Sequence, residues 1–240
     1  MAIRFQDTYF DLVYAPVYDY TVAWMAPYRR FMEDIAGRVS LRQGSMILGV
    51  GAGTGNEFLH LAKAAHGVPF SMVAVDLSRR SLSRARQKCR NIGQNLQTLR
   101  MDGHSLAFGD NQFDTVLCLH AMDFMEDSIS VTREILRVLK KGGEFIITYP
   151  TGRGTRGLAT DLRSSIASNL RRGRFLKATG EAVVTLGAAV AYAPLALSLC
   201  GRRPLLSRSS IESLMESSSV KDFTISEDPA YQDIVVLGKR

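Results

Sequence analysis

One short stretch decides the fold: Ile47-Leu48-Gly49-Val50-Gly51-Ala52-Gly53-Thr54-Gly55. Its apolar beginning suits a strand that is buried on both faces of a parallel sheet. Three glycines at alternate positions follow, and glycine lets a backbone turn tightly and lie against a ligand. The backbone N–H groups at the start of the next helix would then face that ligand. The stretch therefore predicts the first strand of an α/β domain, followed by a turn and a nucleotide-binding helix.

The spacing of the glycines separates two kinds of nucleotide site. A dinucleotide fingerprint has the pattern G-x-G-x-x-G, which fits Gly51 and Gly53 but meets Asn56 where the third glycine belongs. The pattern G-x-G-x-G fits better. In this form the stretch resembles the first motif of the class I S-adenosylmethionine-dependent methyltransferases, roughly (V/I)-L-D/E-(V/I)-G-x-G-x-G. Gly49 departs from that motif, because the family usually has an acidic residue there, near the methionine part of the cofactor.

An acidic residue closes the second predicted strand. The run Phe70-Ser71-Met72-Val73-Ala74-Val75 ends at Asp76. In an open α/β sheet, a carboxylate at this end can accept hydrogen bonds from both ribose hydroxyls of a nucleotide. The alternative is that Asp76 caps the helix that starts at Leu77 or Ser78. We expect the ribose role.

Two further strand ends carry candidate site residues. The third strand, 96–100, leads into Asp102-Gly103-His104-Ser105-Leu106-Ala107-Phe108, which resembles the family's G-D-A-x-x-L-P-F segment. The resemblance implies that Asp102 accepts a hydrogen bond from the adenine amino group. The fourth strand, 113–120, ends in His120, where the family's transferred methyl group and substrate lie. A histidine there can act as a general base, or it can be a structural residue held by hydrogen bonds.

The first 40 residues form an expected N-terminal helical cap, because residues 5–36 have the apolar spacing of amphipathic helices. The segment Tyr14-Ala15-Pro16-Val17-Tyr18-Asp19 resembles the start of ubiquinone/menaquinone C-methyltransferases and of bacterial phospholipid N-methyltransferases. The resemblance implies that aromatic residues here contact cofactor or substrate, and we assign Tyr18 to the cofactor and Tyr14 to the substrate. A packing helix with exposed tyrosines is the alternative.

The elements predicted after the glycine turn alternate between helices and strands. Lys140-Lys141-Gly142-Gly143 suits the end of a helix before a strand at 144–149, and two last strands, 220–226 and 231–237, would pair antiparallel. We expect a single methyltransferase domain over residues 1–240. Its fold class is α/β, with a Rossmann-like, doubly wound sheet of seven strands in which the last strand is antiparallel.

An insertion at residues 151–206 has an unusual composition. Residues 153–208 hold ten Lys or Arg against two acidic residues, Asp161 and Glu181, and the 19 residues 182–200 carry no charge. The uncharged run is only weakly hydrophobic, which makes it a poor membrane span. We expect a basic and apolar helical lid over the substrate, or a segment that rests on an anionic membrane surface. A hairpin that only packs on the core is the alternative.

Composition limits the remaining function classes. Three widely spaced cysteines without a C-x-x-C pair predict neither a disulfide framework nor a metal site. The net charge of +7 comes largely from the apolar insertion, and the arginine-rich helix at 81–91 lacks interleaved aromatic residues, so we do not expect nucleic-acid binding. The chain does not open with a basic segment and an apolar run, so we expect no secretory signal and a cytoplasmic location, with at most peripheral contact at the inner face of the membrane.

These observations combine into one leading hypothesis. S-adenosylmethionine would bind with its methionine part against Gly51, Gly53 and Gly55, and S-adenosylhomocysteine would leave as the product. The acceptor would be a hydrophobic quinone precursor, isoprenoid or aromatic metabolite, held in line with the methyl group near His120 and Tyr149. Two alternatives stay open: a phospholipid head-group N-methyltransferase, and a non-catalytic binding protein of the same fold in which Gly49 marks a lost site.

Overall fold

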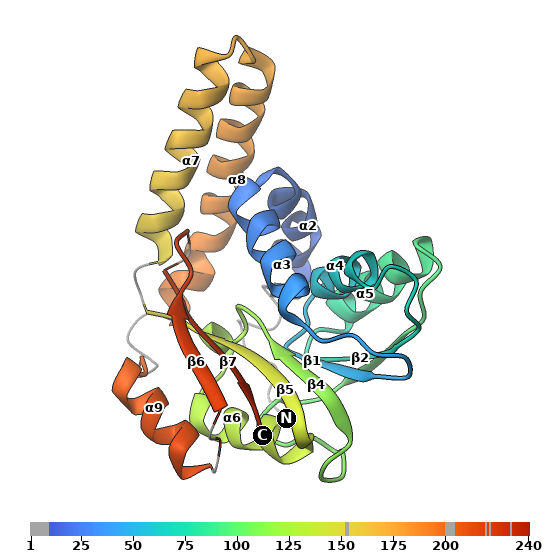
Figure 1. Ribbon diagram of the computed structural model, residues 1–240. Coiled ribbons are helices and arrows are strands. Elements are labelled where there is room, and N and C mark those ends of the chain that lie inside the picture. Colours follow the sequence, from blue (N-terminus) through green and yellow to red (C-terminus); the bar gives the residue numbers. More distant parts are fainter. Residues whose placement is uncertain (1–9, 152–153, 200–204, 219, 221, 231) are drawn as a thin grey trace.

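The computed structural model describes residues 10–151, 154–199, 205–218, 220, 222–230 and 232–240 (Figure 1). Within these residues, seven strands form one sheet in the order β3-β2-β1-β4-β5-β7-β6. Neighbouring strands from β3 to β5 are parallel, whereas β7 is antiparallel to both β5 and β6. Helices cover both faces of the sheet (Figure 1). The predicted Rossmann-like, doubly wound sheet with an antiparallel last strand is confirmed.

The strand order reverses beside the first strand. β2 lies on one side of β1 and β4 on the other, so the connections that follow β1 and β4 run in opposite directions. Ligands of open α/β sheets bind in the crevice at such a reversal, outside the carboxyl ends of the strands. The strands are β1 (Met46–Val50), β2 (Ser71–Asp76), β3 (Leu96–Arg100), β4 (Phe113–Cys118), β5 (Leu139–Tyr149), β6 (Asp222–Glu227) and β7 (Ile234–Lys239).

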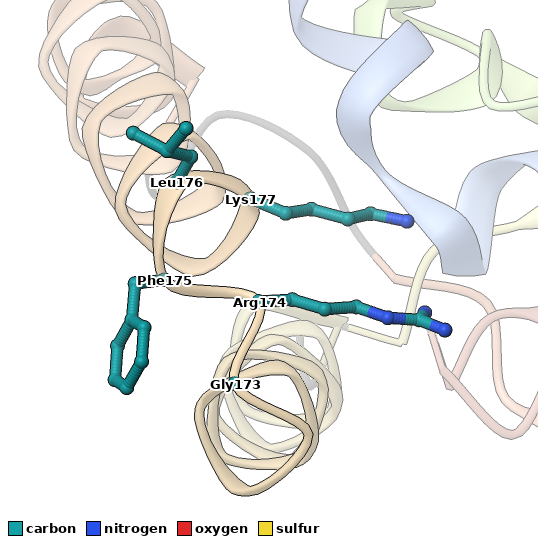
Figure 2. Close-up of a pocket in the computed structure, with 5 residues that line it drawn as sticks. All are labelled: Gly173, Arg174, Phe175, Leu176 and Lys177. Carbon is teal, nitrogen blue, oxygen red and sulfur yellow. The ribbon is translucent and has the colours of Figure 1, made fainter.

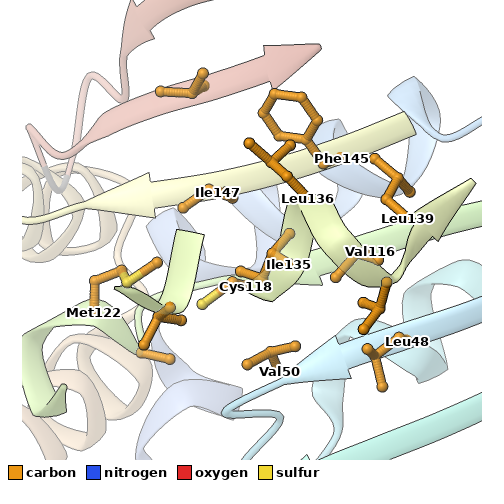
Figure 3. Close-up of a cluster of buried hydrophobic side chains, with 14 of the residues drawn as sticks. Leu48, Val50, Val116, Cys118, Met122, Ile135, Leu136, Leu139, Phe145 and Ile147 are labelled. Carbon is orange, nitrogen blue, oxygen red and sulfur yellow. The ribbon is translucent and has the colours of Figure 1, made fainter. Parts of the chain in front are cut away.

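Two apolar clusters bury the two faces of the sheet. On one face, Val116 and Ile147 pack with Ile135 and Leu136 of α6, and α9 extends this cluster (Figure 3). On the other face, α3, α4 and α5 cover a second cluster. The helices are the π-helix η1 (Phe10–Tyr14), α2 (Ala15–Trp24), α3 (Ala26–Arg38), α4 (Asn56–Ala64), α5 (Arg79–Asn91), the short 3₁₀-helix η2 (Met122–Phe124), α6 (Ser128–Val138), α7 (Gly154–Arg171), α8 (Phe175–Leu199) and α9 (Arg208–Ser217).

Residues 140–143 differ from the expectation. The sequence places the Lys-Lys-Gly-Gly run at a helix end, but α6 ends at Val138 and the run belongs to β5. The pairing of β5 with β4 shifts register between Phe113 and Thr115, and Gly142 has a φ of 75°. Residues that locally resemble a turn are therefore held in a bulged strand by backbone hydrogen bonds from its neighbours.

The insertion forms a helical hairpin. Helices α7 and α8 rise from the domain side by side, next to α2 (Figure 1). At Gly180 of α8 a Cβ atom would lie 2.9 Å from Cζ3 of Trp24, so the glycine lets α2 pack closely on the hairpin. None of the described helices is long and apolar enough to cross a membrane. The role of the hairpin as a lid stays a prediction.

Candidate cofactor and acceptor site

The glycine turn joins β1 to α4 and has three glycines in the left-handed region. Gly51, Gly53 and Gly55 have φ values of 64°, 52° and 72°, which side chains with a Cβ rarely adopt. A Cβ atom at Gly51 would lie 2.5 Å from Cβ of Ala121, and one at Gly55 would lie 2.8 Å from Cβ of Ala85. A Cβ atom at Gly53 would meet nothing within 4 Å. Two of the glycines therefore let protein elements pack, and only Gly53 faces open space.

Asp76 ties the end of β2 to the glycine turn. Its carboxylate accepts hydrogen bonds from the backbone N–H groups of Gly53 and Ser78, both at 2.8 Å. Burial raises the pKa of Asp76, and these two hydrogen bonds oppose that rise. The cap of α5 is Ser78, whose Oγ accepts from the N–H of Ser81. Asp76 is therefore not the helix cap, and it lies at the carboxyl edge of the sheet beside the turn.

Asp102 follows β3 at the same edge. Its Oδ1 atom lies 2.6 Å from Nδ1 of His104, and Nε2 of His104 accepts from the N–H of Asp127 at 3.2 Å. His104 thus connects the predicted adenine residue to the start of α6. A Cβ atom at Gly103 would lie 3.1 Å from Cγ1 of Val50. The loop after β3 therefore lies directly beside the end of β1.

A polar network fastens the N-terminal helices over the glycine turn. Oδ1 of Asp19 in α2 accepts hydrogen bonds from Oγ1 of Thr54 at 2.6 Å and from Nζ of Lys88 at 2.8 Å. Nδ2 of Asn56 donates to the hydroxyl of Tyr28 in α3 at 3.2 Å, and that hydroxyl lies 3.3 Å from the hydroxyl of Tyr18. The network places Tyr18 near the turn, and contact between Tyr18 and the cofactor stays a prediction.

The carboxyl group of Glu57 lies beside Gly49, which has no side chain of its own. A Cβ atom at Gly49 would lie 2.8 Å from Cζ of Phe58 and 3.0 Å from Oε1 of Glu57, both in the first turn of α4. An acidic side chain at position 49 would collide with the Phe58 ring. This packing is a physical reason for the glycine.

His120 follows β4, and its backbone and its ring are both held by several contacts. Its φ is 49°, a region that costs a residue with a Cβ about 1–2 kcal/mol. The backbone N–H donates to Oγ1 of Thr148 at 2.6 Å, and Nδ1 lies 3.1 Å from Oδ2 of the buried Asp233. The ring packs on Phe31, with 4.6 Å between centroids. Strain held in place by several contacts is typical of functional positions.

Comparison with known proteins decides the family. The family model for a methyltransferase domain matches residues 48–147. A phosphatidylethanolamine N-methyltransferase of Cereibacter sphaeroides is 34% identical over 147 residues, which are 60% of this chain and 68% of that enzyme. The chain belongs to the class I S-adenosylmethionine-dependent methyltransferases. The ubiquinone/menaquinone biosynthesis C-methyltransferase UbiE of Escherichia coli is 29% identical over 122 residues, which cover 50% of this methyltransferase and only 47% of UbiE.

Solved structures show the same fold at low sequence identity. A proposed S-adenosyl-L-methionine-dependent methyltransferase of Methanococcus maripaludis superposes with a TM-score of 0.63 at 19% identity, covering 100% of this chain and 96% of that one. A phosphoethanolamine N-methyltransferase of Haemonchus contortus, solved with S-adenosylhomocysteine, gives a TM-score of 0.56 at 18% identity, covering 92% of this chain and 46% of that one. These likenesses support the fold of this methyltransferase.

The residues at the carboxyl edge fit S-adenosylmethionine. Open space at Gly53, the carboxylate of Asp76 and the Asp102 loop gather at the ends of three neighbouring strands. Tyr14 lies in η1, and its side chain is outside the described part of the chain. Tyr149 does not join this group, because its side chain is 1% exposed and its hydroxyl lies 2.7 Å from Oγ1 of Thr132 in the core. A substrate role for Tyr149 stays a prediction that its position does not support.

The sequence patterns do not identify four residues of the site: Asp19, Glu57, Lys88 and Asp233. Their partners are distant in the chain, as with Lys88 and Asp19, so no local pattern identifies them. Only Glu57 has a local signal, since an acidic residue in the first turn of a helix is typical of an N-terminus.

The buried Glu57 should make the stability of this methyltransferase depend on pH. Burial raises the pKa of its carboxyl from 4.5 to about 8. Between these values the folded state keeps a proton that the unfolded state releases, so stability is lost as the pH rises, by about 1.4 kcal/mol per pH unit. We expect Glu57→Gln to remove this loss, which denaturant unfolding of the cofactor-free protein at acidic and at mildly basic pH would measure. The exposed Glu33→Gln is the control, and equal pH dependence in Glu57→Gln and the wild type would contradict the assignment.

Proposed function

We propose that this protein transfers the methyl group of S-adenosylmethionine to a hydrophobic small molecule held beside His120. One observation carries the proposal: the glycine turn lies against Ala121, the residue after His120, whose ring pairs with Asp233. Ala121, the neighbour of His120, touches Gly51, and the aromatic rings of Phe31 and Tyr28 lie against the His120 ring. An apolar acceptor would find apolar walls there, next to the proposed methyl donor.

The chain's own residues would have four roles in this reaction. Asp76 and Asp102 would hold the nucleoside, and the buried Glu57 would bring a carboxyl group, protonated at neutral pH, to the place that Gly49 leaves without one. Bound S-adenosylmethionine supplies an electrophilic methyl group. With its Nδ1–H held by Asp233, His120 would present Nε2 as the proton acceptor, as in other carboxylate–histidine pairs. Rings of α3 over His120 would exclude water.

A second acceptor class is supported by one of the relatives. The enzyme of Cereibacter sphaeroides is a phosphatidylethanolamine N-methyltransferase, and it is the more similar of the two relatives described above. In phospholipid head-group methylation the acceptor is an amine, so no dedicated base is required. The two classes therefore differ in how strongly the rate depends on His120.

The test combines cofactor binding with methyl transfer. We expect calorimetric titration of the purified protein to show micromolar binding of S-adenosylmethionine and of S-adenosylhomocysteine. Methyl-labelled cofactor should then label quinone precursors, isoprenoids or aromatic metabolites in organic extracts, and label in phosphatidylethanolamine would instead support the second class. Folded, ligand-free protein that binds neither form of the cofactor would contradict the proposal and leave the non-catalytic alternative.

A further inference from the structure

The turn between α7 and α8 carries apolar side chains that the fold does not bury. Phe175 is 65% exposed and Leu176 is 92% exposed. A turn that only faces water usually consists of glycine and polar residues, because these satisfy its backbone and its hydration. Large apolar residues at such a turn lose contact with water only when something else covers them. Their position indicates an interaction surface.

Basic residues surround the same turn. Residues 171–177, which we call the hairpin tip, include Arg171, Arg172, Arg174 and Lys177, all exposed, and residues 162–180 contain no acidic residue. Figure 2 shows Arg174 and Lys177 extending from one side of the turn while Phe175 and Leu176 extend from the other. A hollow of about 460 Å³ lies among these side chains, remote from the glycine turn. The tip thus combines positive charge with apolar bulk.

The hairpin holds its tip away from the rest of the protein. The tip is the end of the hairpin that lies farthest from the sheet (Figure 1). Just below it, the carboxylate of the buried Glu181 accepts hydrogen bonds from Nδ2 of Asn169 at 3.0 Å and from Oγ of Ser165 at 3.2 Å. This cluster joins α7 to α8, and the contact of Gly180 with Trp24 fixes α8 on α2. A broad, flat partner could reach the tip without touching the sheet.

We propose that the hairpin tip docks this protein on the surface of an anionic lipid bilayer. Phe175 and Leu176 enter the boundary between head groups and acyl chains. The basic residues, with their long aliphatic stems, reach the lipid phosphates from the same depth. A purely apolar tip would bind any bilayer, and a purely basic tip would bind any polyanion. The combination of apolar and basic side chains therefore favours a bilayer of anionic lipid. The inference goes beyond the proposed function, since it holds whichever acceptor is methylated.

Sedimentation with vesicles tests the docking of the whole protein. One vesicle preparation is pure phosphatidylcholine, and the other contains an equal amount of phosphatidylglycerol. We expect binding to the mixed vesicles to be at least about tenfold tighter and to weaken as salt screens the charges. Phe175→Ser combined with Leu176→Ser should weaken it at least about 30-fold, because two apolar side chains no longer leave water. Changing the four basic residues to Gln should remove the preference for anionic vesicles.

A matched variant separates the tip from general surface hydrophobicity. Val183 and Leu186 of α8 are 65% and 68% exposed, and replacing both by Ser should change vesicle binding by less than about twofold. The proposal is overturned if wild-type protein shows no preference for the mixed vesicles, or if the Phe175 and Leu176 double variant binds them normally. It is also overturned if the tip variants lose self-association instead. Calorimetry with S-adenosylmethionine separates the proposals: vesicle binding without cofactor binding would contradict the proposed function alone.

Discussion

Replacing Asp76 by alanine is expected to weaken S-adenosylmethionine binding at least about 100-fold, or about 2.8 kcal/mol at 1.4 kcal/mol per tenfold. The carboxylate holds the N–H groups of Gly53 and Ser78, and the substitution leaves both without this acceptor. It also removes the group that we assign to the ribose hydroxyls, and each hydrogen bond to a charged group contributes roughly 1.5–3 kcal/mol. Calorimetric titration of the variant measures the loss.

Two variants make the Asp76 result specific. Asp76→Asn keeps one oxygen as an acceptor, so its affinity should lie between those of the wild type and Asp76→Ala. Asp34→Ala removes an exposed carboxylate that only pairs with Arg38 on the surface of α3, and it should bind the cofactor normally. Wild-type affinity in a folded Asp76→Ala protein would show that this carboxylate does not hold the cofactor.

Replacing His120 by glutamine is expected to lower kcat at least about 100-fold if the acceptor is a phenol, an enol or an acidic carbon. Glutamine keeps the approximate size of the side chain but cannot take up a proton. Asp233→Asn should lower kcat less, because it leaves the imidazole in place and removes only the carboxylate 3.1 Å from Nδ1. Labelled cofactor with the identified acceptor provides both measurements.

His66→Gln is a matched control for His120→Gln. His66 also has a left-handed backbone, with a φ of 46°, but it is exposed in the loop between α4 and the amino end of β2, whereas His120 follows the carboxyl end of β4. Its replacement should leave kcat unchanged. If His120→Gln retains wild-type kcat and cofactor affinity, the base assignment is wrong, and the result favours an amine acceptor.

Local residue patterns predict much of the fold. Alternating helices and strands, the three glycines and the acidic end of β2 are all readable from neighbouring residues, because period and turn chemistry are local properties. The prediction of a helix end at 140–143 is wrong for the same reason. The local preference for a turn is overridden because backbone hydrogen bonds tie Gly142 and Gly143 to Arg240, the residue after β7. The role of Gly49 is not readable either, since it depends on how α4 packs on β1.

The sequence by itself determined the order of the strands along the chain, the family resemblance and the residues at the ends of β1, β2, β3 and β4. Only the tertiary structure decided which of the glycines faces open space, and it brought Asp19 to Lys88, Glu57 to Gly49 and Asp233 to His120. The tertiary structure also shows that Tyr149 is buried in the core and that Phe175 and Leu176 are exposed at the hairpin tip. The physical reason is that the packing of whole elements decides which side chains become partners. His120 and Asp233 are more than 100 positions apart, so the residues around each of them do not indicate their contact.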